Sequence, residues 1–191
     1  DHSSNFDFVI VGGGSAAFSA ALTANDKGAK VLIINDGLPV GGTCVNVGCI
    51  PSKRLIRVAE RIHQASENPF VGIQLSRPKI NFKKIIQNKN QLVETLRTKK
   101  YYDVIKDKPG IHLLKSRGII HSRNQVKAGD KTYTAKKILI ATGASTRIPD
   151  IKGIEKVDPL THIDLFKLEE LPASLTILGA GYIRSEERRV G

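Results

Sequence analysis

The stretch FDFVIVGGGSAAFSAALTANDKGAKVLII, residues 6–34, decides the fold of this chain. It opens with an apolar run rich in β-branched residues, 6–11, which predicts a buried strand. The glycines at 12–14 end that strand, residues 15–28 are typical of a helix that closes at a glycine, and 30–34 predicts a second buried strand. A strand, a helix and a strand at this spacing form a βαβ unit, whose strands run parallel. The sequence therefore predicts an α/β fold built on a parallel sheet.

The glycines between the first strand and the helix fit a dinucleotide-binding motif. Gly12, Gly14 and Ala17 match G-x-G-x-x-A. In that motif the first glycine permits a tight turn, the second lets the backbone approach a pyrophosphate, and the helix N-terminus holds the anion. A glycine-rich turn without a ligand has the same pattern, but the βαβ context favours dinucleotide binding. The ribose-binding position at the end of the second strand falls at Asn35, with Asp36 beside it, and both stay open.

Apolar spacing predicts the elements that follow. One helix carries a stripe of Leu55, Ala59 and Ile62, and a second runs from Phe82 toward Ile105. Short apolar runs separated by turns over 111–134 predict a small antiparallel meander, and 136–143 is typical of another buried strand ending in glycine. A linker then leads to LTILGAGYI, residues 175–183, which repeats the pattern of a strand followed by glycines.

Charge and composition narrow the possible partners. The 191 residues carry a formal charge of +12, much of it between Lys79 and Lys108. Such a field could attract nucleic acid, but no aromatic residues or groove-reading motif accompany it, so a solvated helix face is favoured. No apolar run approaches the roughly 18 residues that span a bilayer, and the N-terminus lacks the features of a secretory signal. We therefore expect a cytoplasmic protein with no nucleic-acid or membrane partner.

Both cysteines lie in the stretch GGTCVNVGCIPSK, residues 41–53. In a cytoplasmic chain a close cysteine pair favours redox or metal chemistry over a structural staple. A lone pair supplies only two of the four ligands that zinc usually takes. The histidines are scattered and are interpreted as surface or core residues: His2, His63, His112, His121 and His162. Redox chemistry is therefore favoured over metal binding, with two inert buried thiols as the plainer alternative.

The spacing of the cysteines sets a condition on the local backbone. Residues five apart in a regular helix point about 140° away from each other, so their sulfurs could not bond. We expect a disulfide to close only if Cys44 lies in the turn before a helix and Cys49 in its first turn. Three glycines permit such irregular backbone: Gly41, Gly42 and Gly48. A helix N-terminus favours the reactive thiolate, and Lys53 lies about one turn further along.

The stretch GGTCVNVGCIPSK resembles the active-site signature of the class I pyridine nucleotide-disulfide oxidoreductases. The resemblance extends over residues 6–183: VIVGGG resembles their FAD motif, ATG at 141–143 a second FAD contact, and GAGYI the start of their NAD(P)H domain. It implies a Rossmann-like FAD-binding domain over 1–150, then a linker and the start of a second Rossmann-like domain over 151–183. The last eight residues, RSEERRVG, resemble translated sequencing adapter, and we expect 184–191 to be non-native.

Within the family, the segments GGSAAFSAA, NPFVG, LVETLRTKKYYDVI and ATGAS most resemble mercuric reductases, with dihydrolipoamide dehydrogenase as the alternative. The resemblance implies FAD and NADPH or NADH as cofactors, and Hg(II) or a disulfide as substrate. It implies a homodimer for the full-length protein, whose C-terminal domain completes the partner's active site. We therefore expect this fragment alone to be inactive. From a different class, a non-catalytic basic binding module remains an alternative.

The resemblance also implies residue roles. Cys49 would lie against the flavin, Cys44 would exchange with substrate and bind Hg(II) together with Cys49, Lys53 would tune the flavin, and Tyr182 would cover the nicotinamide side. The implied FAD contacts are Gly12, Gly14, Ser15, Ala16, Asn35 or Asp36, Gly42, Thr43, Lys53, Ala141, Thr142 and Gly143. The implied NAD(P)H contacts are Gly179 and Gly181, after which Arg184 departs from the expected third glycine.

Overall fold

The structure is a computed structural model that describes residues 4–67, 70–73, 76 and 78–179. By their contacts, the residues form two compact units. The first comprises residues up to Asn46 together with Glu94–Ile148, and the second comprises Val47–Val93 and the residues from Pro149 onward. The expected boundary at residue 150 between two family domains stays a prediction, since contacts within this chain do not test it.

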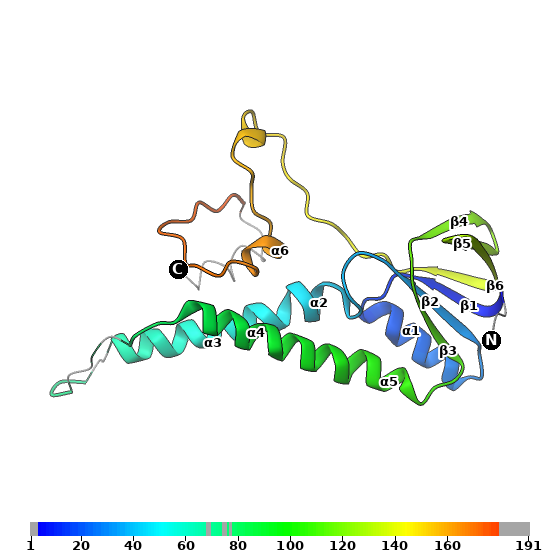
Figure 1. The fold of residues 1–191 in the computed structure, drawn as a ribbon, viewed down its shortest axis with the longest axis horizontal. Coiled ribbons are helices and arrows are strands. Elements are labelled where there is room, and N and C mark those ends of the chain that lie inside the picture. Colours follow the sequence, from blue (N-terminus) through cyan, green and yellow to red (C-terminus); the bar gives the residue numbers. More distant parts are fainter. Residues whose placement is uncertain (1–3, 68–69, 74–75, 77, 180–191) are drawn as a thin grey trace. The chain divides into compact units, whose positions relative to one another are not determined.

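One six-stranded sheet organises the first unit, in the order β3-β2-β1-β6-β5-β4. The strands are β1 (Asn5–Val11), β2 (Val31–Asn35), β3 (Ile111–Lys115), β4 (Gly118–Ser122), β5 (Gln125–Ala128) and β6 (Lys131–Ile140). β1 pairs in parallel with both β2 and β6, and β2 pairs in parallel with β3. β4, β5 and β6 pair antiparallel (Figure 1). The predicted α/β fold, a parallel sheet with an antiparallel meander, is confirmed.

One part of the predicted meander is wrong. Residues 111–115 form β3, which joins the parallel part of the sheet beside β2. The meander consists of β4, β5 and the first part of β6, whose Thr134 is in register with both Gln125 of β5 and Asn5 of β1. Alternating apolar residues mark a strand but do not specify its neighbour, which explains the error.

The first glycine motif follows a strand whose second half is buried. In β1, Val9 and Ile10 are fully buried, as a strand covered on both faces requires. The helix α1 (Ser15–Asp26) packs on β1 and β2 (Figure 1). Its buried side chains are Ala17, Phe18 and Ala21. Val9 belongs to a core cluster of buried side chains in the same sheet: Phe6, Val9, Val11, Leu32, Ile34, Val126, Ala128 and Ala135.

The other helical segments are short except for two. They are α2 (Gly42–Val47), α3 (Cys49–Ser66), α4 (Phe82–Arg97), the π-helical segment η1 (Thr98–Tyr102), α5 (Asp103–Lys106), the short 3₁₀ segment η2 (Ile154–Lys156) and α6 (His162–Leu165). The long helix predicted from Phe82 toward Ile105 is confirmed, with η1 inside it. In α3 the most buried aliphatic side chain is Ile56, whereas Leu55, Ala59 and Ile62 of the predicted stripe are half-buried. None of the described helices is long and apolar enough to cross a membrane.

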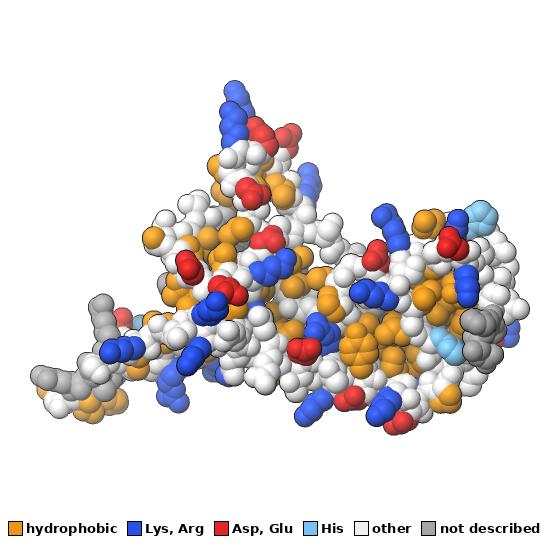
Figure 2. Space-filling view, in the orientation of Figure 1, with side chains coloured by type: hydrophobic (Ala, Val, Ile, Leu, Met, Phe, Trp, Pro, Cys, Tyr) orange, Lys and Arg blue, Asp and Glu red, His pale blue; other side chains and the backbone are white. Residues whose placement is uncertain are grey.

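The basic segment between Lys79 and Lys108 was expected to form a solvated helix face, and one of its lysines is buried. On the face shown in Figure 2, Lys and Arg side chains are interspersed with Asp and Glu. Lys83 and Lys108 pair with acidic side chains at 3.0 and 2.7 Å. Lys89, however, is buried, and its Nζ donates to the carbonyl oxygen of Phe166, at the end of α6, at 2.5 Å. Burial lowers the pKa of this amine. The expectation of a fully solvated face is therefore wrong at Lys89, because this side chain fixes α6 to α4.

The second strand-and-glycine pattern does not form a strand in the described residues. Residues 174–179 have no regular secondary structure, and Leu175 and Leu178 are exposed. A strand is stable only when another strand pairs with its backbone, and no described strand pairs with this segment. The remainder of the pattern, 180–183, and the segment 184–191 lie outside the described residues.

Candidate active site

The first glycine turn is built so that backbone atoms touch. Gly12 has φ +119°, and its N–H donates to the carbonyl oxygen of Ile34 at 2.8 Å. A Cβ added at Gly12 would lie 2.1 Å from the carbonyl oxygen of Ala141, which follows β6. The N–H of Ala141 in turn donates to Val11 at 2.8 Å. Gly12 is thus needed where the end of β1 meets the chain leaving β6, since no other residue fits.

A second glycine turn lies against the first. The N–H of Gly41 donates to the carbonyl oxygen of Gly13 at 2.7 Å, and Gly14 and Gly41 form an isolated parallel bridge. A Cβ on Gly42, which has φ +58°, would lie 2.9 Å from the Cα of Gly14. The predicted cofactor residues at 12–14 and at 42 therefore come together in the first unit by direct backbone contact.

The N-terminus of α1 opens onto this pair of turns. Its N-cap is Gly14, which offers no side chain to the free backbone N–H groups of the first turn, and that turn holds no acidic residue. Ser15 and Ala16 are exposed. The positive end of the helix dipole is therefore left available to an outside anion. A diphosphate fits this cradle, because backbone donors converge where Gly12, Gly14 and Gly42 leave no side chains.

The two candidates for the ribose differ in their surroundings. The Asn35 side chain lies against the glycine turn, since a Cβ on Gly13 would lie 2.4 Å from its Oδ1. Its Nδ2 donates to the carbonyl oxygen of Leu38 at 3.0 Å. Asp36 is exposed. Of the predicted second contact, Ala141 touches Gly12, while Thr142 and Gly143 are exposed.

The cysteines lie in two successive helices. Cys44 belongs to α2, so the expectation that it lies in a turn is wrong, and Gly48 separates α2 from α3. Cys49 is the first residue of α3, as its predicted place in a first helical turn requires. Both side chains are exposed. Cys44 falls in the first compact unit and Cys49 in the second, on either side of the boundary after Asn46.

At the start of α3, near Cys49, Ser52 makes hydrogen bonds to the backbone of Gly48. The hydroxyl of Ser52 donates to the carbonyl oxygen of Gly48 at 2.8 Å, and its N–H donates to the same oxygen at 3.1 Å. The N-cap Gly48 contributes no side-chain hydrogen bond. Lys53 is exposed one helical turn after Cys49. The thiol thus lies at the N-terminal end of an 18-residue helix.

Asn46, which lies in the same helix as Cys44, anchors α2 to the chain before it. The role of this residue was not predicted from the sequence. Its Nδ2 lies 2.9, 3.1 and 2.8 Å from the carbonyl oxygens of Pro39, Val40 and Gly42. Its Oδ1 accepts from Arg97 at 3.0 Å. The only signal in the sequence is a polar residue between Val45 and Val47, both buried. The side-chain amide of Asn46 thus fixes α2 to the second glycine turn through hydrogen bonds to backbone carbonyl oxygens.

Replacing Asn46 with Ala should lower the melting temperature of the chain by about 4–8 °C, because several partners of the amide lose their hydrogen bond. Circular dichroism on heating measures this. Asn90→Ala, at an exposed position of α4, is the matched control and should change stability by no more than about 0.5 kcal/mol. Equal melting temperatures for the two variants would contradict the role given to Asn46.

The other predicted residues are not gathered at these turns. Gly179 is exposed with φ +123°, and Gly181 and Tyr182 lie outside the described residues, as does His2. His63 and His121 are exposed, and His112 packs edge-on against Phe6, where burial lowers its pKa. Within the described ranges no three His, Cys, Asp or Glu side chains gather as a metal site would require.

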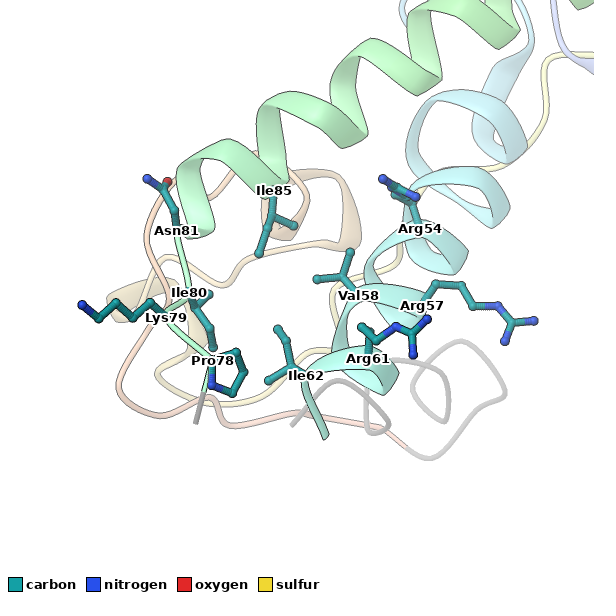
Figure 3. Close-up of a pocket in the computed structure, with 10 residues that line it drawn as sticks. All are labelled: Arg54, Arg57, Val58, Arg61, Ile62, Pro78, Lys79, Ile80, Asn81 and Ile85. Atoms are coloured by element: carbon teal, nitrogen blue, oxygen red, sulfur yellow. The ribbon is translucent and has the colours of Figure 1, made fainter. Parts of the chain in front are cut away.

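A separate hollow lies in the second unit. Its volume is about 400 Å³. Figure 3 shows Val58 and Ile62 of α3 facing Ile85 of α4 across it, with Arg54 and Arg61 on the α3 side. It contains neither a cysteine nor a glycine of the turns, so it takes no part in the site predicted from the sequence.

Comparison with known proteins identifies the family. The model of the pyridine nucleotide-disulphide oxidoreductases matches residues 6–187. The chain belongs to this family. The resemblance predicted from the cysteine stretch is therefore confirmed.

Several relatives in this family are mercuric reductases. That of Lysinibacillus sphaericus is 44% identical over 182 residues, which is 95% of this chain and 33% of the relative. The enzyme of Bacillus cereus is also 44% identical, over 95% of this chain and 28% of the relative. That of Staphylococcus aureus is 40% identical over 95% of this chain. The chain thus spans about a third of the length of the curated relatives it matches.

Solved structures of the family share the fold. The HOCl-induced flavoprotein disulfide reductase RclA from Escherichia coli superposes with a TM-score of 0.80 at 31% identity, over 97% of this chain and 40% of its own. Its Cu(II) complex gives 0.79 at the same identity. The Rossmann-like fold predicted for this pyridine nucleotide-disulphide oxidoreductase is confirmed by these matches.

Proposed function

We propose that the full protein transfers two electrons from NADPH or NADH through FAD to the Cys44–Cys49 pair and from there to Hg(II). The observation that carries this is the exposed pair of cysteines five residues apart, directly after a glycine cradle, in a chain 44% identical to mercuric reductases. FAD and NAD(P)H are the cofactors of the pyridine nucleotide-disulphide oxidoreductases, the family that matches residues 6–187. This chain covers about a third of the length of those relatives. The activity, substrate and partners of the whole protein are therefore inferred from that part.

The first unit supplies the groups that would hold FAD. The backbone N–H groups of Ser15 and Ala16 and the gap left by Gly12 and Gly42 would bind the pyrophosphate. Asn35 is proposed for the ribose in preference to Asp36, since its side chain lies against Gly13. Bound FAD supplies a two-electron carrier between a nicotinamide and a disulfide. Thr43, Ala141, Thr142 and Gly143 are proposed as further contacts, with Lys53 close to the flavin.

The two thiols have different proposed tasks. Reduction of a Cys44–Cys49 disulfide takes two electrons and two protons and yields two thiols, whose thiolates bind Hg(II), a soft metal that prefers sulfur. Two further electrons convert the bound Hg(II) to elemental mercury, which leaves. Cys49, at the start of α3, is proposed to face the flavin, and Cys44 to exchange with the substrate.

The remaining proposals concern the whole protein. Gly179, Gly181 and Tyr182 are proposed for the NAD(P)H side. A homodimer in the cytoplasm is proposed for the full protein, because thiol exchange suits a reducing compartment.

A disulfide substrate is the second candidate. It is supported by the match to a flavoprotein disulfide reductase at a TM-score of 0.80. The two candidates share the cofactors and the cysteine pair and differ only in what the exchange thiol attacks.

The test is to assay the full protein encoded by the gene with NADPH and either Hg(II) or an oxidised dithiol. We expect bound FAD, Hg(II)-dependent oxidation of NADPH and release of volatile mercury. Oxidation of NADPH only with the dithiol would move the function to the second candidate. A purified protein without flavin that does not oxidise NADPH with either substrate would overturn both.

A further inference from the structure

Tyr101 reaches the first glycine turn from a distant part of the chain. It lies in η1, and its side chain is 9% exposed, whereas that of the next residue, Tyr102, is 45% exposed. Its hydroxyl lies 3.0 Å from the Oγ of Ser15, the first residue of α1. The pair joins positions 86 residues apart within the first unit.

The ring of Tyr101 packs between α1 and the second glycine turn. It packs edge-on against Phe18 of α1, with centroids 4.9 Å apart and planes at 88°. A Cβ on Gly41 would lie 2.8 Å from the Cε2 of Tyr101. One side chain thus packs against the start of α1 on one side and the turn before α2 on the other.

The backbone that carries Tyr101 departs from α-helical geometry. In η1 the N–H of Asp103 donates to the carbonyl oxygen of Thr98, five residues earlier. Such π-helical turns are rare and occur frequently at functional sites. The widened turn in the run from α4 to α5 therefore coincides with the residue that contacts the glycine motif.

The hydrogen bond between the two hydroxyls decides where the Ser15 proton points. A serine hydroxyl has one proton to donate, and the oxygens of an ionised pyrophosphate only accept. When the more acidic phenol of Tyr101 donates to the Oγ of Ser15, the Ser15 proton stays available at the N-terminus of α1. When Ser15 donates to Tyr101 instead, its proton is no longer available to the pyrophosphate.

We propose that Tyr101 is a positioning residue for the dinucleotide: its phenol donates to Ser15 and so directs the Ser15 hydroxyl proton toward the pyrophosphate. The inference rests on the proposed function, since it requires FAD to bind at α1. It adds a residue of the distant helix to a site otherwise formed by glycine turns.

The test is the affinity of the flavin-free full protein for FAD, followed by flavin fluorescence. Tyr101→Phe removes one oxygen and keeps the ring against Phe18 and Gly41, so the flavin-free protein should lose no more than the roughly 0.5–1.5 kcal/mol of one hydrogen bond and stay folded. The dissociation constant of FAD should rise roughly tenfold, as loss of a hydrogen bond that serves a charged group does. Tyr102→Phe, at the exposed neighbour, is the matched control and should bind FAD like the wild type.

A double variant shows whether Tyr101 acts through Ser15. Ser15→Ala should weaken FAD binding, and adding Tyr101→Phe to it should weaken binding no further. Normal FAD affinity in Tyr101→Phe, or the same loss with and without Ser15, would overturn the inference alone. A wild-type protein that binds no FAD would overturn the proposed function, and the inference with it.

Discussion

Serine at either Cys44 or Cys49 is expected to lower Hg(II)-dependent NADPH oxidation by the full protein on the order of 10³-fold or more, because the two residues act as one redox unit. A serine hydroxyl neither forms a disulfide nor binds Hg(II) as a thiolate does. The rate of NADPH oxidation with Hg(II), measured at matched FAD content, gives this result. Both side chains are exposed, so neither substitution disturbs packing.

The two serine variants should differ in their spectra. Cys44→Ser should retain the long-wavelength absorbance that a thiolate beside the flavin produces, whereas Cys49→Ser should lose it. The same band in both variants would contradict the different tasks given to the two thiols. Ser52→Ala is a useful control, since Ser52 is near Cys49 but donates only to backbone oxygens. It should keep both the band and most of the turnover.

Alanine at Gly12 is expected to abolish FAD binding and to reduce the yield of folded protein. The new Cβ would lie 2.1 Å from the carbonyl oxygen of Ala141, on a backbone with φ +119° that other residues rarely adopt. Overpacking and backbone strain together should cost about 3 kcal/mol or more. Soluble yield and flavin absorbance per purified protein measure the result.

Gly28→Ala separates the two causes. Gly28 also has a positive φ, +83°, but a Cβ there would have no neighbour within 4 Å. This variant should lose only about 1 kcal/mol and keep its FAD. Equal effects at the two positions would mean that the close approach of Gly12 to Ala141 has no special importance.

Local pattern was enough to predict the parallel core and the first glycine motif. The apolar runs at 6–11 and 30–34 are short, rich in β-branched residues and flanked by glycine, which favours strands, and the longer segment between them favours a helix. The pairing partner of a strand is harder to predict from local pattern, because it depends on the order of all strands in the sheet. Residues 111–115 were therefore assigned to the meander, whereas they pair with β2.

The contacts that support the site depend on tertiary structure and left little trace in the sequence. Asn46 meets Arg97, and Tyr101 meets Ser15, only because the end of α4 and η1 pack beside the glycine turns. Lys89 was expected in solvent because lysine is seldom buried, yet the carbonyl oxygen of Phe166 provides it with a partner. Side-chain type predicts such contacts poorly when the partner is far along the chain.

The central claim is that a cysteine pair works in series with FAD, and a reductive titration without oxygen tests it most directly. The oxidised full protein should take up two pairs of electrons per bound FAD, one for the flavin and one for the Cys44–Cys49 disulfide, while Cys44→Ser should take up one. Uptake of a single pair by the wild-type protein, with both cysteines already reactive toward a thiol reagent, would contradict the account.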